Sequence, residues 1–264
     1  MKLFEVLPRR RHFEMLSHLN QENRGDHKVV MISEVDLTAI ETLRQTFGTS
    51  GEKPSYTSCL AKSIILALKK NPASNRFVWD FPFWTRLVQL STYDISVAVE
   101  KDTPGSEQAV YVGTIRGANA KSLLEVNAEL KEFASATPEN STRVRNWKFF
   151  FEKFWWVWLA KQLISLPRYF PSLWIEHRGG AVVISSPAKY GVDIMVAHWP
   201  WPVGFSFGLV KDRPIVVGHE IQIKKTMYVT MSFDRRIMAG APAARFFKDV
   251  CSFLENPDKL NAKF

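Results

Sequence analysis

Hydrophobic and polar residues along the chain follow two different periods, which predict strands in some segments and helices in others. Apolar and β-branched residues run together or alternate with polar ones, as in strands, at 28–35, 87–100, 181–186, 204–210 and 226–233. Apolar residues recur every three to four positions, as on one face of a helix, at 9–20, 37–43, 60–68, 120–134 and 240–255. Strands mixed with helices over this length predict an α/β fold, of the two-layer α+β type.

Aromatic residues are concentrated in the segment 147–174, which contains five of the nine tryptophans of the chain. Between 150 and 159 they recur at helical spacing, and Pro167 and Pro171 then end the helix. Three interpretations of this apolar helix stay open. It packs as core within or between subunits, it lines a wide hydrophobic pocket for a long acyl chain or an aromatic substrate, or it lies on a membrane surface.

The net charge of +9 favours an anionic ligand, an anionic membrane surface or nucleic acid as a partner. We expect no nucleic acid, because Arg9, Arg10 and Arg11 stand without any RNA- or DNA-binding motif around them. The sequence also lacks phosphate-binding loops, zinc-protease motifs and the nucleophile elbow of hydrolases. Cys59 and Cys251 lie far apart in apolar helical patterns, so neither a disulfide nor a metal site is expected.

The sequence carries no signal for export or for spanning a membrane. Its first residues lack the apolar run and cleavage site of a signal peptide, and no window of about 18 residues is free of charge. We therefore expect a cytoplasmic protein, with peripheral membrane contact through 147–174 as the alternative. No repeat or low-complexity linker divides the chain, so we expect a single domain over 1–264.

Several segments resemble a known family. The run VTMSFDRRIMAGAPAARFFKDVCSFLENP at 229–257 is similar to the acyltransferase core of 2-oxoacid dehydrogenase complexes, and to chloramphenicol acetyltransferase, which shares that fold. The resemblance extends to GGAVVISSPAKYGVD at 179–193 and to ALKKNPASN at 67–75, in the same order. It implies a chloramphenicol acetyltransferase-like mixed sheet flanked by helices, with an aromatic-rich insertion at about 136–178.

The same resemblance implies substrates and partners. The family uses an acyl-CoA thioester, so we expect acyl-CoA as co-substrate and no tightly bound cofactor. The family also builds its channel between subunits, which implies a homotrimer. Because the resemblance covers the chain from its first helix, without lipoyl or subunit-binding segments, we expect a free-standing protein rather than a component of a dehydrogenase complex.

The family's catalytic motif, HxxxDG, is altered in this chain. Its His is the general base, and its Asp orients the loop by pairing with an arginine of the first helix, which Arg9 matches. The matching stretch reads RRIMAG, with Arg235 at the His position and Ala239 at the Asp position. A guanidinium keeps its proton in proteins, so Arg235 cannot serve as a base. General-base catalysis typically supplies about 10²–10⁴-fold in rate, and the inherited mechanism should be nearly silent without it.

Two other residues are candidates for the site. Ser185 matches the family's hydroxyl donor to the tetrahedral oxyanion, a role worth about 3 kcal/mol in the transition state; alternatively it only ends a strand. His198 follows in the loop that borders the acyl channel in this superfamily, where it would serve as a displaced base. Alternatively, His198 is a packed structural residue beside two tryptophans.

These observations leave two main hypotheses. The chain is a CoA-thioester-dependent acyltransferase that acts on a hydrophobic acceptor or acyl chain with a rearranged site containing Ser185, His198 and Arg235. Alternatively, it is a catalytically inactive relative, a pseudoenzyme that serves as a trimeric scaffold or a ligand-binding protein. The double change at 235 and 239 favours the second. A weaker third hypothesis is that Arg235 binds an anionic substrate in an altered reaction.

Overall fold

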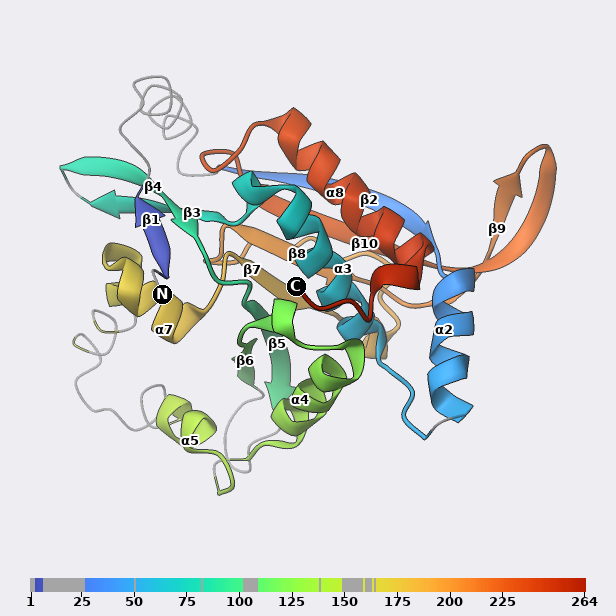
Figure 1. Ribbon diagram of the computed structural model, residues 1–264, viewed down its shortest axis with the longest axis horizontal. Coiled ribbons are helices and arrows are strands. Elements are labelled where there is room, and N and C mark those ends of the chain that lie inside the picture. Colours follow the sequence, from blue (N-terminus) through green and yellow to red (C-terminus); the bar gives the residue numbers. More distant parts are fainter. Residues whose placement is uncertain are drawn as a thin grey trace.

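The computed structural model describes residues 3–6, 27–49, 51–81, 83–101, 109–137, 139–148, 159, 163 and 165–264 (Figure 1). These residues form a large mixed sheet, a small three-stranded sheet and a set of helices. The helix predicted at 9–20 and much of the aromatic segment 147–174 lie outside the described residues. Within the described ranges, no helix is both long enough and apolar enough to cross a bilayer.

The large sheet has the strand order β2-β10-β8-β7-β5-β6, and β9 pairs with β10 off this path. Its strands are β2 (Lys28–Asp36), β5 (Ile95–Lys101), β6 (Ala109–Ile115), β7 (Val182–Ser185), β8 (Val203–Phe207), β9 (Lys211–Val217) and β10 (Glu220–Asp234). The short strand β7 runs parallel to both β5 and β8, and the other pairs are antiparallel. This mixed sheet confirms the predicted fold class.

Helices α3, α4 and α8 lie over one face of the large sheet, and three further helices lie toward its edges (Figure 1). The helices are α2 (Thr38–Thr49), α3 (Tyr56–Lys70), α4 (Leu123–Ser135), α5 (Thr142–Lys148), α7 (Pro171–Arg178) and α8 (Gly240–Glu255). The central helix α3 packs against both α8 and α4, and it is buried continuously from Ser58 to Leu68. The Ser55 hydroxyl accepts the Ser58 backbone N–H and caps its start, and Pro72 prevents its continuation.

The small sheet joins the aromatic segment to the core. Its order is β1-β4-β3, formed by β1 (Phe4–Val6), β3 (Arg76–Phe81) and β4 (Trp84–Leu90). The Trp174 ring of α7 stacks on Phe77 of β3, with centroids 4.8 Å apart, and both side chains are buried. Trp174 lies beyond the two prolines that end the predicted helix, so its burial shows core packing only at the exit of the segment. Residues 150–158 of the predicted helix lie outside the described residues, and the three interpretations of that helix stay predictions.

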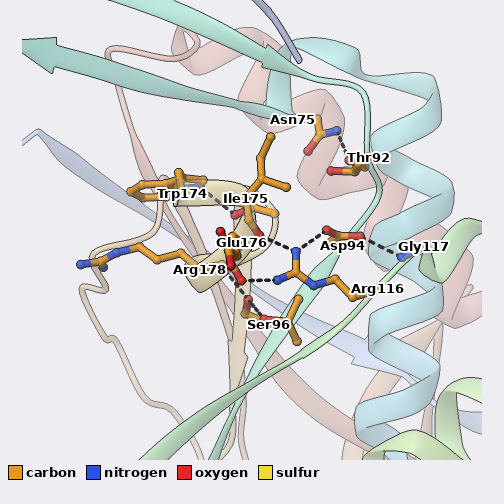
Figure 2. A network of polar contacts seen from close by, with 12 residues as sticks. Asn75, Thr92, Asp94, Ser96, Arg116, Gly117, Trp174, Ile175, Glu176 and Arg178 are labelled. Carbon is orange, nitrogen blue, oxygen red and sulfur yellow. Dashed lines mark hydrogen bonds and ion pairs between the residues drawn. The ribbon is translucent and has the colours of Figure 1, made fainter. Parts of the chain in front are cut away.

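Helix α7 is fixed to the large sheet by a polar network around Arg116 (Figure 2). The Arg116 guanidinium pairs with the buried Asp94 carboxylate at 2.9 Å, and it donates to the carbonyls of Ile175 and Glu176 at the end of α7. A cation at this end also complements the helix dipole. Asp94 in turn accepts the backbone N–H of Gly117 at 2.8 Å. The exit of the aromatic segment is therefore held in one position on the sheet.

Strand β9 and the first part of β10 form a two-stranded arm that projects from the large sheet (Figure 1). Gly218, with φ +64°, lies in the two-residue turn that joins them, a conformation that favours glycine. Three aliphatic side chains of the arm are more than two-thirds exposed: Val216 (71%), Ile221 (76%) and Ile223 (78%). In the antiparallel register Val216 lies opposite Ile221, and Ile223 is two residues further along, so all three share one face.

The sequence prediction missed β3, β6, β9 and the first half of β10. The alternation at 226–233 was correct, but the strand begins at Glu220 because residues 220–225 pair with β9. The helices at 60–68, 120–134 and 240–255 are confirmed as α3, α4 and α8, within a few residues at their ends.

Candidate functional site

Two adjacent serines at the end of β7 have different surroundings. The Ser186 hydroxyl donates to the Phe207 carbonyl at 2.9 Å and accepts the Ala188 N–H at 3.2 Å, so it holds the chain as it leaves the sheet. The Ser185 hydroxyl has no hydrogen-bond partner among the described residues, and it lines a cavity of about 510 Å³. Of these two serines, Ser185 is therefore the one whose hydroxyl is open to a ligand.

This cavity, which we call the Ser185 cavity, has an apolar lining with charged residues at a few points. Its apolar side chains come from β5, β6, β7 and α4, and include Val97, Val99, Val110, Ile184 and Leu130. Both of its lysines are paired with a glutamate: Lys189 with Glu100 at 2.5 Å and Lys131 with Glu52 at 2.8 Å. The Lys189 hydrogen bond lowers the pKa of Glu100, which keeps both groups charged at neutral pH.

His198 lies on an extended segment, 192–199, that crosses over β8 and β10. The Thr230 and Ser232 hydroxyls donate to the carbonyls of Met195 and Ala197, at 2.8 and 2.9 Å, and hold the segment on the sheet. The segment passes so close to the end of β8 that position 208 requires glycine. A Cβ on Gly208 would lie 1.7 Å from the Asp193 carbonyl oxygen. Even-numbered side chains face solvent, and His198 is exposed. His198 is therefore not the packed residue that one interpretation expected.

The turn that follows β10 is built around an ion pair between Asp234 and Arg236. The Arg236 guanidinium donates to the Asp234 carboxylate at 2.8 Å and to Asp80 of β3 at 3.4 Å. Between them, the Arg235 backbone N–H donates to the His27 carbonyl at 2.8 Å, and the Arg235 side chain is exposed. The turn thus holds its shape without help from the side chain at 235.

Ala239 occupies the N-cap position of α8, with extended backbone angles and no side-chain hydrogen bond to the helix. An aspartate or serine in this conformation accepts a backbone N–H from the first turn and satisfies one of its free donors. The first turn of α8 is therefore left without a side-chain cap by the alanine at this position.

The strand register places Ser185 and Arg235 at opposite ends of the sheet. Ser185 of β7 pairs with Ser206 of β8, and Ser206 in turn pairs with Thr230 of β10. Arg235 follows five residues later, about 16 Å further along the strand direction. Neither Arg235 nor His198 lines the Ser185 cavity, so one chain does not bring the three predicted residues together.

Comparison with known proteins identifies the family. The family described as 2-oxoacid dehydrogenases acyltransferase (catalytic domain) matches residues 8–148 and 175–262, which is most of the chain. The chain belongs to this acyltransferase family. The match leaves out 149–174, which lies within the aromatic segment. Residues 235–240, where the resemblance places the catalytic motif, lie within the matched range.

Curated relatives of this acyltransferase-family chain are about twice its length. It is 26% identical over 235 residues to the dihydrolipoyllysine-residue succinyltransferase component of the 2-oxoglutarate dehydrogenase complex of Rickettsia typhi, covering 86% of this chain and 49% of the relative. The protein of the same name from Bacillus subtilis is 23% identical over 259 residues, covering 95% of this chain and 53% of the relative. The chain thus spans about half the length of the curated relatives it matches.

Solved structures confirm the fold of the family. A probable dihydrolipoamide acetyltransferase from Listeria monocytogenes matches with a TM-score of 0.63 at 17% identity, covering 98% of this chain and 97% of that one. A chloramphenicol acetyltransferase matches with a TM-score of 0.59 at 13% identity, covering 96% and 100%. At this level of identity the likeness extends to the fold alone.

Sequence reasoning missed most of the Ser185 cavity. Ser55, Thr57 and Lys131 line it from the start of α3 and from α4, far from Ser185 in the sequence. No local pattern marks these residues, because the cavity arises only when α4 packs against α3 and β6. In the described part of the chain, histidine, cysteine and acidic side chains do not gather in the groups of three that could hold a metal ion.

Proposed function

We propose that this acyltransferase-family chain binds a CoA thioester but does not carry out the family's base-catalysed acyl transfer. One observation carries the proposal: the turn after β10 is intact, held by Arg236 and Asp234, yet it presents a guanidinium at position 235. A fixed positive charge there binds an anionic group and cannot accept a proton from a thiol, hydroxyl or amine.

The Ser185 cavity would receive the acyl part of the ligand. Its apolar walls suit an acyl chain, and the free Ser185 hydroxyl is placed to donate to the thioester carbonyl. The two lysines at its walls, Lys131 and Lys189, are each neutralised by a glutamate, so the positive charge that complements the CoA phosphates would come from Arg235.

We further propose that the complete site forms between copies of the chain. Ser185 and Arg235 lie about 16 Å apart along the sheet of one chain, which is too far for both to contact one thioester group. In a homotrimer, Ser185 of one copy would meet Arg235 of the next. Light scattering tests this directly, since a protein that stays monomeric at the concentrations of the binding assay would have no such site.

Binding and turnover are measured separately. Calorimetry with acetyl-CoA and octanoyl-CoA tests binding, and CoA release in the presence of dihydrolipoamide, the acceptor that the relatives' names suggest, tests transfer. We expect saturable binding without CoA release above background. The double variant Arg235→His, Ala239→Asp restores the family's residues, and we expect it to release CoA, whereas the triple variant with Ser185→Ala should release it about 100-fold more slowly.

The competing function is acyl transfer to a hydrophobic acceptor with His198 as the base. The exposure of the His198 side chain favours this reading, because an exposed imidazole is accessible to a second copy or to an acceptor. CoA release by the wild-type chain to a hydrophobic amine or alcohol, abolished by His198→Ala, would establish it and overturn the proposal above. Absence of acyl-CoA binding would reject both functions.

A further inference from the structure

The hairpin formed by β3 and β4 is aromatic on one face. In its antiparallel register Trp79 lies opposite Arg86 and Phe81 lies opposite Trp84, so the side chains of these four residues share one face. The Trp84 ring meets Trp79 edge to face, with centroids 4.5 Å apart, and it stacks on Phe81 at 5.6 Å. We call this surface the aromatic face of the hairpin.

Exposure of the aromatic face rises toward the tip of the hairpin. At its base Phe77 and Val88 are buried, and further along Phe81 and Trp84 are partly exposed. Because Phe81 pairs with Trp84, Phe83 lies in the two-residue turn at the tip, where its side chain is 88% exposed. Figure 1 shows the hairpin projecting at the opposite end of the molecule from the arm of β9 and β10. The tip therefore presents a large aromatic side chain to the surroundings.

The 3₁₀-helix η4 (Leu166–Tyr169) lies beside the hairpin and enlarges its apolar surface. The carbonyl of its last residue accepts a hydrogen bond from Trp79 Nε1 at 2.7 Å, and the ring of the same residue meets Phe81 edge to face. Leu166, at the start of η4, and Phe170, just after its end, have exposed side chains. These residues fall in the segment 149–174, which the family match leaves out.

The charge on this side of the hairpin is positive. Arg168 of η4 is exposed, lies 5.0 Å from the Tyr169 ring, and makes no ion pair among the described residues. The two carboxylates of the small sheet, those of Glu5 and Asp80, alternate onto the opposite face, and Arg236 donates to Asp80 there. The net charge of the chain, +9, also favours an anionic surface as partner.

A projecting aromatic tip beside an exposed arginine fits the surface of a bilayer. Tryptophan and tyrosine concentrate at the membrane–water interface, because each joins an apolar ring to a polar group. Apolar side chains enter the boundary between headgroups and acyl chains, while cationic side chains contact anionic headgroups. A stable protein interface instead buries roughly 800 Å² on each partner, which a broad face supplies more readily than a narrow tip.

We propose that the tip of the β3–β4 hairpin, together with η4, is a docking surface for an anionic lipid bilayer. Phe83 inserts below the headgroups, Trp84 and Tyr169 lie at the level of the headgroups, and Arg168 contacts the lipid phosphates. The docking surface shares no residue with the lining of the Ser185 cavity, so membrane binding does not depend on the binding of acyl-CoA.

Co-sedimentation with lipid vesicles tests the docking surface. We expect the wild type to bind vesicles of phosphatidylcholine mixed equally with phosphatidylglycerol, and to bind vesicles of phosphatidylcholine alone about tenfold more weakly. Raising the salt concentration should weaken binding to the mixed vesicles. Equal binding to both kinds of vesicle, or binding to neither, would overturn the proposal.

Variants locate the contact. Phe83→Ser removes the inserted ring and should weaken binding to the mixed vesicles about tenfold or more, whereas Phe83→Trp should retain it. Arg168→Glu reverses a charge and should weaken binding about fivefold or more. Val216→Ser on the arm and Arg245→Glu on α8 are the matched controls at exposed positions, and both should bind nearly as the wild type does. Normal binding by Phe83→Ser, or an equal loss in the controls, would show that vesicles bind elsewhere and would refute the proposal.

A second copy of the chain is the competing occupant of the tip. Light scattering of the wild type and of Phe83→Ser, both without lipid, separates the two occupants, because only docking between copies at the tip makes the oligomeric state depend on Phe83. We expect the same oligomeric state for both proteins, with circular dichroism confirming that the variant is folded. A smaller assembly in Phe83→Ser would assign the tip to the second copy and overturn membrane docking.

Discussion

Arg236 donates hydrogen bonds to both carboxylate oxygens of Asp234, two residues before it in the chain. Its backbone N–H donates to Asp234 Oδ1 at 2.9 Å, and its guanidinium donates to Oδ2 at 2.8 Å. Both side chains are largely buried. The shape of the turn is thus set by the residues at 234 and 236, and the side chain at 235 takes no part in holding the backbone.

We predict that Arg236→Ala destabilises the protein by about 3 kcal/mol. The substitution leaves the Asp234 carboxylate buried without its ion-pair partner, which is the costly way to break such a pair. Urea unfolding monitored by circular dichroism measures the change. Arg235→Ala, one residue away and exposed, is the matched control and should lie within about 0.5 kcal/mol of wild type. Equal effects of the two substitutions would show that the ion pair does not hold the turn.

A second prediction concerns the uncapped start of α8. Ala239→Asp should stabilise the protein by about 1 kcal/mol, because its carboxylate accepts a free backbone N–H and also complements the helix dipole. Ala239→Ser should give a smaller gain. Ala244→Ser, at an exposed position inside the same helix, should instead destabilise slightly, since serine is a poorer helix former than alanine. Thermal unfolding distinguishes these outcomes, and a loss of stability in Ala239→Asp would contradict the prediction.

A third prediction uses two glycines with opposite surroundings. Gly208→Ala should destabilise by about 2–3 kcal/mol, because the new methyl group would overlap the Asp193 carbonyl and push the segment 192–199 away from the sheet. Gly240→Ala should be nearly neutral, because a Cβ there meets no atom within 4 Å. Denaturant unfolding of the pair provides the measurement, and equal stabilities would mean that the segment is not held closely on β8.

The fully buried Lys62 should make stability depend on pH in the alkaline range. Its ammonium group donates to the carbonyls of Lys121 and Ala262 at 2.6 and 2.9 Å, and burial followed by repulsion from Lys263 lowers its pKa to about 8. The unfolded chain has an ordinary lysine pKa near 10.4. Between these values the unfolded state binds more protons, so the contribution of Lys62 to the unfolding free energy rises with pH.

Lys62→Met tests this dependence. Relative to the variant, the wild type should gain up to about 3 kcal/mol between pH 8 and 10.4, and the difference should be constant below pH 8, where the lysine is protonated in both states. Measuring both proteins at each pH cancels the titration of the other lysines and tyrosines. Parallel stability curves over the whole range would show that Lys62 is not perturbed.

The elements with a strong local pattern could be predicted from the sequence. In α3 the apolar spacing, the serine cap and the proline stop all agree, and helix and prediction coincide. Strand β9 shows the opposite case: KDRPIVV has no clean alternation and contains a proline, and it forms a strand only because β10 pairs with it. Its hairpin signal was present, since Gly218 followed by His219 is typical of a two-residue turn.

The sequence was enough to name individual candidate residues of the site. It was not enough to predict how far apart these residues lie. The family resemblance located Ser185 and Arg235, yet the distance between them depends on the register of β7, β8 and β10, which the sequence does not encode locally. For the same reason, the resemblance could not tell that Ser186 is bonded to the Phe207 carbonyl while Ser185 is free.

The projecting arm of β9 and β10 has a consequence for how assembly can be observed. Residues 220–225 pair only with β9 among the described strands, and an isolated two-stranded ribbon is marginally stable in water. In a lone chain the amide protons of Ile221 and Ile223 should therefore exchange with solvent far faster than those of the central part of β10. If copies of the chain cover the apolar face of the arm, that exchange slows, so these two amides would report the association state without any label.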